Sequence, residues 1–193
     1  MAKPICLEEN RLFSMSIDNG YELVENFNKN HCVTPKTQLI IVGTITPPQG
    51  TVNGYFYTAP RNKIYGYIDE ALNTNLKELK NSLSKPNSDK NQTISEIKSI
   101  LKETGIAFLD IMKSAIRVKE SPYDSDIKYY SLDVDSFKNI PDSVYFICNS
   151  KLAEDGYKQI CEKLGRKDNH ILLSQRRAKK TEWIDNIKRN LNK

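Results

Sequence analysis

The sequence predicts an α/β protein, namely a three-layer α/β/α sandwich around a central four-stranded parallel sheet. Two observations lead to this fold class. Four short apolar runs, at residues 39–42, 106–111, 143–148 and 170–173, have the composition of buried strands. The stretches between them carry apolar residues every three or four positions, which is typical of amphipathic helices. Strands that alternate with helices favour a parallel sheet with right-handed crossovers.

The composition is that of a soluble globular protein. The chain has 193 residues, of which 38% are hydrophobic and 27% are charged, and we expect a single domain over residues 1–193. No apolar run approaches the roughly 18 residues of a membrane helix, so we expect no membrane contact. No apolar segment follows the first lysine, so we expect no secretory signal and a cytoplasmic location. We also expect a monomer. The net charge of +5 is compatible with a polyanionic partner.

The cysteines and histidines do not form a metal-binding pattern. The four cysteines are scattered without a C-x-x-C pair, and the chain has two histidines. We therefore expect free thiols, no metal site and no cofactor. These residues are Cys6, Cys32, Cys148, Cys161, His31 and His170.

The first half of the chain divides into an extension and two helices. Residues 1–36 are expected to form an N-terminal extension, with a short amphipathic helix at residues 21–27. A long apolar stripe predicts a helix at residues 64–83. A capping-box pattern at Thr93 and Glu96 predicts the start of the next helix, and Gly105 its end.

The second half of the chain continues the alternation. The polar residues 113–130 predict a long loop, and residues 134–140 a short helix. Ser150 is expected to cap a helix that Gly165 ends, and Thr181 to cap the last helix.

The loop after the first strand is the most informative stretch. It contains three prolines, which exclude regular structure, and three adjacent aromatic residues, Tyr55, Phe56 and Tyr57. Loops of this length are either functional or disordered, and disordered segments contain few aromatic residues. We therefore expect a shaped loop at the carboxyl end of a strand, where open α/β sheets bind their ligands.

Residues 57–65, Tyr-Thr-Ala-Pro-Arg-Asn-Lys-Ile-Tyr, follow Gly-Thr-Ile-Thr-Pro-Pro. Together they resemble the first motif block of the uracil-DNA glycosylase superfamily, most closely its hypoxanthine-DNA glycosylase and mismatch-type uracil glycosylase branches. The resemblance continues at residues 105–111, 114–117 and 124–127. It implies the same α/β/α architecture, and a monofunctional enzyme that hydrolyses the N-glycosidic bond of a deaminated or damaged base, such as uracil or hypoxanthine, in DNA.

The resemblance implies roles for two residues of this block. Tyr57 matches the aromatic residue that stacks on the extruded base, although it could instead anchor the loop to the core. Asn62 matches the catalytic asparagine of the hypoxanthine branch, where the amide would hold a water molecule against the sugar. An asparagine at this position could also cap the following helix.

Further residues at the strand ends are candidates for substrate binding. Gly43, Thr44 and Thr46 could contact the edge of the base. Arg61 could bind phosphate or hold Asp110. Asp110 is unusual in an apolar strand, and we expect it, with Ser114, to rigidify the floor of the pocket rather than to activate water. Other branches of the superfamily carry a polar residue where this chain has Ile45.

The loop after the fourth strand departs from the family, which has a proline-containing wedge there. Instead it carries four cations that oppose the dipole of the following helix. They suit a phosphate backbone, and a solvated basic turn is the alternative. His170 stands at the start of this strand, and we expect it at the surface or at a cap. The candidate DNA-binding residues are Ser174, Arg176, Arg177, Lys179 and Lys180.

Two other functions remain open at this point. One is a non-catalytic nucleic-acid-binding or nucleotide-sensing protein of the same fold, which the altered loops at Ile45 and at residues 174–177 favour. The other is a doubly wound protein of a different kind that binds a small ligand in the tyrosine-rich loop. The sequence contains neither a dinucleotide fingerprint nor a Walker loop in support of it.

Overall fold

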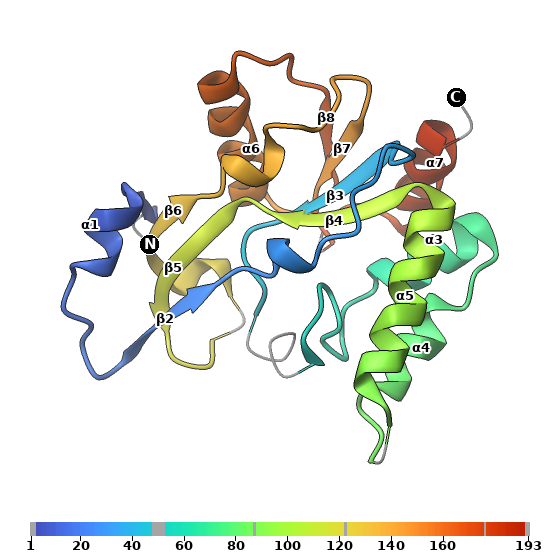
Figure 1. The fold of residues 1–193 in the computed structure, drawn as a ribbon, viewed down its shortest axis with the longest axis horizontal. Coiled ribbons are helices and arrows are strands. Elements are labelled where there is room, and N and C mark those ends of the chain that lie inside the picture. Colours follow the sequence, from blue (N-terminus) through green and yellow to red (C-terminus); the bar gives the residue numbers. More distant parts are fainter. Residues whose placement is uncertain (1–2, 48–52, 87, 122, 176, 192–193) are drawn as a thin grey trace.

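The computed structural model describes residues 3–47, 53–86, 88–121, 123–175 and 177–191. Its centre consists of two four-stranded sheets, which Figure 1 shows with the helices around them. None of the helices in these ranges has the length and apolarity that a membrane crossing requires.

The first sheet confirms the predicted parallel sheet. Its strands are β3 (Leu39–Gly43), β4 (Ile106–Asp110), β7 (Tyr145–Cys148) and β8 (His170–Leu172). They lie in the order β4-β3-β7-β8, and every neighbouring pair is parallel. All residues of β3 and β4 are buried, as expected of strands that are covered on both faces.

Helices cover both faces of this sheet. In register, Phe108 of β4 pairs with Ile41 and Phe146 of β7 pairs with Ile40, so the two phenylalanines point to opposite faces. Tyr65 of α3 (Ile64–Leu72) contacts the Phe108 ring, and Tyr157 of α6 (Lys151–Leu164) contacts the Phe146 ring. Helix α7 (Lys180–Leu191) packs on α3. The three-layer arrangement is therefore as predicted.

A second sheet corrects two predictions. It consists of β1 (Ile5–Cys6), β2 (Tyr21–Glu25), β5 (Met112–Val118) and β6 (Ile127–Leu132), in the order β1-β6-β5-β2. The helix predicted at residues 21–27 is wrong because Tyr21–Glu25 pairs antiparallel with β5. The loop predicted at residues 113–130 is wrong because most of it forms β5 and β6.

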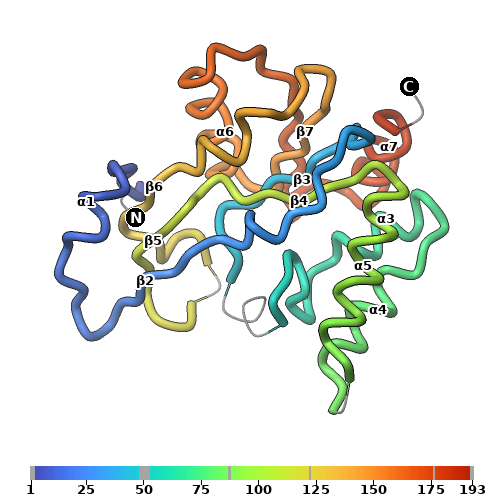
Figure 2. The backbone as a smooth tube through the Cα atoms, viewed as in Figure 1, coloured from blue at the N-terminus to red at the C-terminus, as the bar shows by residue number. Residues whose placement is uncertain are grey.

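The chain passes directly from one sheet to the other. Only Ile111 separates β4 from β5, and its backbone N–H donates to the carbonyl of Gly43. Figure 2 shows the resulting arrangement, in which β2, β5 and β6 lie on one side of the parallel sheet and α3, α4 and α5 on the other. The short helix α1 (Glu9–Phe13) packs on the second sheet. The strand ends of the first sheet consequently face residues of the second sheet.

The predicted helix at residues 64–83 is two helices. Asn73 adopts the left-handed conformation (φ 57°) and ends α3, and α4 (Leu76–Ser82) follows. The carboxylate of Asp69 accepts hydrogen bonds from the backbone N–H groups of Leu76 and Lys77. Asp69 of α3 therefore satisfies the first backbone donors of α4, which allows a second helix to start directly after the first.

The other predicted caps are partly confirmed, but Thr181 does not cap the last helix because that helix already begins at Lys180. Helix α5 (Lys90–Thr104) is capped by Asp89 rather than by Thr93, and Gly105 ends it with φ 74° as predicted. Ser150 caps α6 as predicted, by accepting from the backbone N–H of Ala153. The described residues also contain three short 3-10 helices: η1 (Asn28–Asn30), η2 (Asp124–Asp126) and η3 (Asp135–Phe137). The last of these lies within the short helix predicted at residues 134–140.

Candidate functional site

The carboxyl ends of β3 and β4 bring three candidate residues together. Gly43 pairs in register with Asp110 at the last position of both strands. A methyl group placed on Gly43 would lie 2.4 Å from Oδ1 of Asp110 and 2.8 Å from the hydroxyl of Tyr57. The Asp110 carboxyl and the Tyr57 hydroxyl therefore press against the backbone of Gly43, and only glycine leaves them room.

Asp110 is a buried carboxyl with a perturbed pKa. Its side chain is 2% exposed, and the hydroxyl of Thr46 donates to its Oδ2 at 2.8 Å. Burial raises the pKa of Asp110 to about 7, the bond from Thr46 opposes the rise, and the charges of Asp124 and Asp133 add to it. Near neutral pH this carboxyl can therefore either accept or donate a hydrogen bond.

Asn28 fixes the backbone of Asp110, which sequence analysis did not anticipate. Its Oδ1 accepts from the N–H of Asp110, and its Nδ2 donates to the carbonyl of Asp110, both at 2.8 Å. The Nδ2 also donates to Asp133 at 2.7 Å. Since β4 is an edge strand, this buried amide satisfies backbone groups that a fifth strand would otherwise pair. Asn28 lies 82 positions from Asp110, so no local pattern indicates the contact.

Tyr57 combines an unusual backbone with a partly buried ring. Its φ of 54° lies in the left-handed region, which a bulky residue seldom adopts. The ring packs edge-on against Phe108, with 5.0 Å between the ring centroids, and the hydroxyl accepts from Nδ2 of Asn149 at 3.2 Å. Burial raises the pKa of Tyr57 well above its ordinary value, and the charge of Asp110 adds to this effect. Strained residues of this kind concentrate at functional sites.

Asn149 extends the cluster to a third strand. It directly follows β7, and its backbone N–H donates to the carbonyl of Val42. The rule that singles out Gly43 and Asp110, namely polar or small residues at the carboxyl ends of parallel strands, also applies to Asn149.

Thr44 connects the strand ends to the second sheet. Its hydroxyl donates to Oδ1 of Asp124 at 2.7 Å. Arg117 of β5 is a buried guanidinium whose Nε lies 4.0 Å from Oε1 of Glu22 and has no hydrogen-bond partner among the described residues. Burial lowers the pKa of Arg117, and the carboxylates of Glu22 and Asp124 oppose that effect. Ser114 is also buried, and its hydroxyl has no partner among the described residues.

Asn62 and Arg61 lie in the turn before α3. The side-chain Oδ1 of Asn62 accepts from the backbone N–H of Ile64 at 3.0 Å, which is a capping-type bond at the start of the helix. Arg61 is exposed, whereas Asp110 is buried and bonded to Thr46. Within the described part of the chain Arg61 therefore does not hold Asp110, which leaves its guanidinium available to a ligand.

The basic loop after β8 is only partly available to phosphate. Arg177 and Lys179 are exposed, and Arg176 lies outside the described residues. Lys180 forms an ion pair with Glu70 of α3, so its charge is already compensated. The backbone carbonyl of Ser174 accepts from the N–H of Arg177 and thereby closes a turn.

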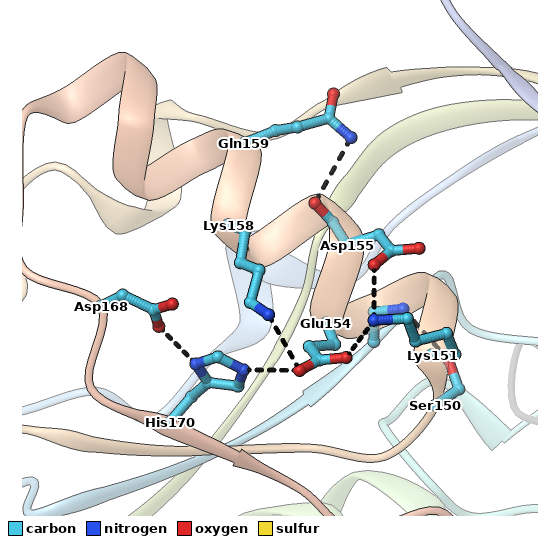
Figure 3. A network of polar contacts seen from close by, with 9 residues as sticks. Ser150, Lys151, Glu154, Asp155, Lys158, Gln159, Asp168 and His170 are labelled. Atoms are coloured by element: carbon cyan, nitrogen blue, oxygen red, sulfur yellow. Dashed lines mark hydrogen bonds and ion pairs between the residues drawn. The ribbon is translucent and has the colours of Figure 1, made fainter.

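His170 belongs to a polar network instead of standing alone at the surface. Figure 3 shows its ring between Asp168 and Glu154, with Nε2 at 3.0 Å from Oε1 of Glu154. Lys151 and Lys158 also pair with Glu154. The pKa of Glu154 falls to about 2, chiefly through the hydrogen bond from Lys151. The network joins the start of β8 to α6, which is a structural role for His170.

Two cavities lie outside this cluster. One, of about 580 Å³, is lined by Asn53 and the turn between α4 and α5, and another of about 60 Å³ lies against the second sheet. Neither is lined by Asn62, Tyr57 or Arg177. The described residues contain no group of three or more His, Cys, Asp or Glu side chains arranged for a metal ion.

Comparison with known proteins supports the fold. No protein-family model and no curated protein matches the chain. A similar fold occurs in the solution NMR structure of a protein from Methanosarcina acetivorans that is provisionally named a uracil DNA glycosylase. The match has a TM-score of 0.59 and 18% sequence identity, and covers 84% of this chain and 96% of the other. At this identity, the likeness shows that the two chains share a fold.

Proposed function

We propose that this protein hydrolyses the N-glycosidic bond of a deaminated or damaged base, uracil or hypoxanthine, extruded from DNA. The observation that carries the proposal is the left-handed Tyr57, whose ring is held beside Asp110 at the carboxyl ends of β3 and β4. A flipped base loses its stacking neighbours, and an aromatic face at a polar strand end can replace them. The Pro-Arg-Asn sequence before α3 supports the hypoxanthine-DNA glycosylase and mismatch-type uracil glycosylase branches.

The polar groups around Tyr57 suit the edge of a base. Thr44 and Thr46 follow Gly43 at the end of β3, and each hydroxyl, which donates its proton to a carboxylate, keeps lone pairs that can accept a hydrogen bond. Asp110 can accept from a ring N–H as a carboxylate or donate to a ring carbonyl as an acid, because its pKa lies near neutrality. Ser114 supplies a further buried hydroxyl to the floor of the site.

The bond-breaking step requires a positioned water molecule. Oδ1 of Asn62 already accepts from Ile64, and a carbonyl oxygen has a second lone pair that can accept from water. We assign to Asn62 the role of holding this water against the anomeric carbon as positive charge develops on the sugar. Water adds to the sugar, the base departs with a proton, and the phosphodiester backbone stays intact.

The DNA backbone would lie over the exposed cations at the same edge. Arg61, Arg177 and Lys179 are exposed and suit phosphate contacts. Ser174 and Arg176 belong to the same proposed surface by sequence. Lys180 contributes less because Glu70 already pairs with it.

Base release from synthetic oligonucleotides tests the proposal. The wild-type protein is expected to release free base from strands with a single uracil or hypoxanthine and to leave an alkali-sensitive abasic site. Asn62→Ala is expected to lower the rate by about 10²-fold, the usual effect of losing one transition-state contact. Asn10→Ala, at an exposed position of α1, serves as the control and should leave the rate unchanged. If the folded wild-type protein releases neither base, the proposal is rejected.

A non-catalytic nucleic-acid-binding function is the second candidate. It is favoured by Ile45, which is 5% exposed and packs in the core where related branches carry a polar residue. Salt-dependent DNA binding that survives Asn62→Ala, together with no base release from any strand, would select this function.

A further inference from the structure

Lys80 is a buried lysine that holds the turn before α3. It lies on α4 and is 3% exposed. Its Nζ donates to the backbone carbonyl of Pro60 at 3.1 Å and to that of Asn62 at 3.0 Å. The turn is closed from within by the N–H of Asn62, which donates to the carbonyl of Ala59 at 2.9 Å. The ammonium of Lys80 therefore sits directly beneath the turn at residues 60–63.

This ammonium has no compensating carboxylate among the described residues. Its two hydrogen-bond partners are neutral carbonyls, and no described Asp or Glu forms an ion pair with it. Burial lowers the pKa of Lys80, and the neighbouring charge of Lys77 lowers it further. A buried lysine costs free energy in the folded protein, and such groups are common at functional sites. A neutral donor could hold the two carbonyls without this cost.

The outer side of the same turn is also positively charged. Arg61 and Lys63 are both exposed, and neither forms an ion pair within the described ranges. Together with Lys80, three cations surround a short turn, and none of them is paired with an acid there. A group with negative charge spread over several oxygens would be attracted to all three.

We propose that the turn at residues 60–63 is a binding site for a phosphodiester group. Lys80 holds this turn in shape and adds a third positive charge to those of Arg61 and Lys63. The choice of a nucleic-acid phosphate rests on the proposed function, and the charge arrangement itself suits any phosphate. Arg61 and Lys63 would contact the phosphate, whereas Lys80 acts from beneath as a positioning residue. The phosphate contact of Arg61 and Lys63 would also fix the position of the DNA strand relative to the amide of Asn62, which holds the water.

The test measures binding of an undamaged, single-stranded thymidine oligonucleotide by fluorescence anisotropy at several NaCl concentrations. Losing one phosphate contact should lower the slope of log K against log [salt] by about 0.7. We expect this loss, with several-fold weaker binding at low salt, for Lys80→Gln, which removes the charge but retains a donor. Lys80→Arg should restore the slope. Lys102→Gln, an exposed lysine in the last turn of α5, is the charge-matched control and should retain the wild-type slope.

A thermal melt separates misfolding from loss of the site. If Lys80→Gln does not fold, the double variant Arg61→Gln, Lys63→Gln tests the same turn through its exposed residues. An unchanged slope in a folded variant of either kind overturns the inference. Competition by inorganic phosphate at millimolar concentration would show that the site takes free phosphate as well as a phosphodiester.

The outcome for this site is distinguishable from that for the proposed function. Binding that depends on Lys80 without release of any base would support the phosphate site and remove the enzyme. Base release together with a salt slope that is the same in Lys80→Gln and in the wild type would support the enzyme and reject the phosphate site. If the wild-type protein does not bind the oligonucleotide even at low salt, the inference is overturned.

Discussion

Replacing Asp110 by asparagine is expected to stabilise the protein at pH 8 by up to about 4 kcal/mol. Asp110 is buried, and its pKa rises from the ordinary value of 3.8 to about 7. A shift of that size corresponds to about 4 kcal/mol of unfavourable free energy in the ionised, folded protein. Asparagine carries no charge, and its carbonyl oxygen can still accept the hydrogen bond of Thr46.

The pH dependence of this effect has a definite sign. The folded protein binds the Asp110 proton more tightly than the unfolded chain does. Its contribution to the free energy of unfolding is therefore full below pH 3.8 and is lost as the pH rises to about 7. The variant and the wild type should consequently be equally stable near pH 4 and diverge towards pH 8.

Urea unfolding at pH 4, 6 and 8 measures this difference. Asp185→Asn, at an exposed position of α7, provides the control and should follow the wild type at every pH. If Asp110→Asn is less stable than the wild type at pH 8, or if its stability has the wild-type pH dependence, the account of a strained buried carboxyl is wrong.

Gly43→Ala is expected to destabilise the protein by about 3 kcal/mol, at the upper end of the range for overpacking. The added methyl group would lie 2.4 Å from Oδ1 of Asp110 and 2.8 Å from the Tyr57 hydroxyl. Both neighbours are held in place, because Thr46 bonds the Asp110 carboxylate and Asn149 bonds the Tyr57 hydroxyl. A chain of this length should lose roughly 6–12 °C in melting temperature.

Gly20→Ala is the matched control for this variant. No atom lies within 4 Å of a methyl group built on Gly20. Its expected effect is at most about 1 kcal/mol, in the stabilising direction. Equal melting temperatures for the two variants would mean that the strand ends are not packed as tightly as the structure has them.

The parallel sheet could be predicted because its information is local. Leu39–Gly43 and Ile106–Asp110 are largely apolar runs, and all their residues are buried. A strand of this kind can be recognised from its own residues, without knowledge of the strands that pair with it. The caps at Ser150 and Gly105 follow from the conformations that these residues adopt most easily.

The second sheet could not be predicted because its interior is partly polar. Ser114, Arg117 and Ser131 are all at most 2% exposed, although their composition is that of a loop. Ser114 and Arg117 lie on β5, between β2 and β6, and Ser131 lies on β6, between β1 and β5, so all three belong to the inner strands of the sheet. The apolar residues of Tyr21–Glu25 fit a helix or a strand over so short a length, and pairing with β5 decides between them.

In the candidate site, too, residues with a local sequence signal could be predicted and residues with distant partners could not. Gly43, Asp110 and Tyr57 were identified from strand ends and from an aromatic loop, and the structure places them in contact around one glycine. Asn28 was missed because its partners are distant in the sequence. Lys80 was missed because nothing in an amphipathic helix indicates that a lysine is buried.

The central claim is that Tyr57 provides the face against which an extruded base stacks, and single-turnover base release tests it most directly. The rate from a uracil- or hypoxanthine-containing strand should fall by about 10- to 100-fold in Tyr57→Ala, which removes one stacking contact. It should be largely retained in Tyr57→Phe, which keeps the ring and loses only the hydroxyl that Asn149 contacts. A folded Tyr57→Ala protein that releases base at the wild-type rate would contradict the account.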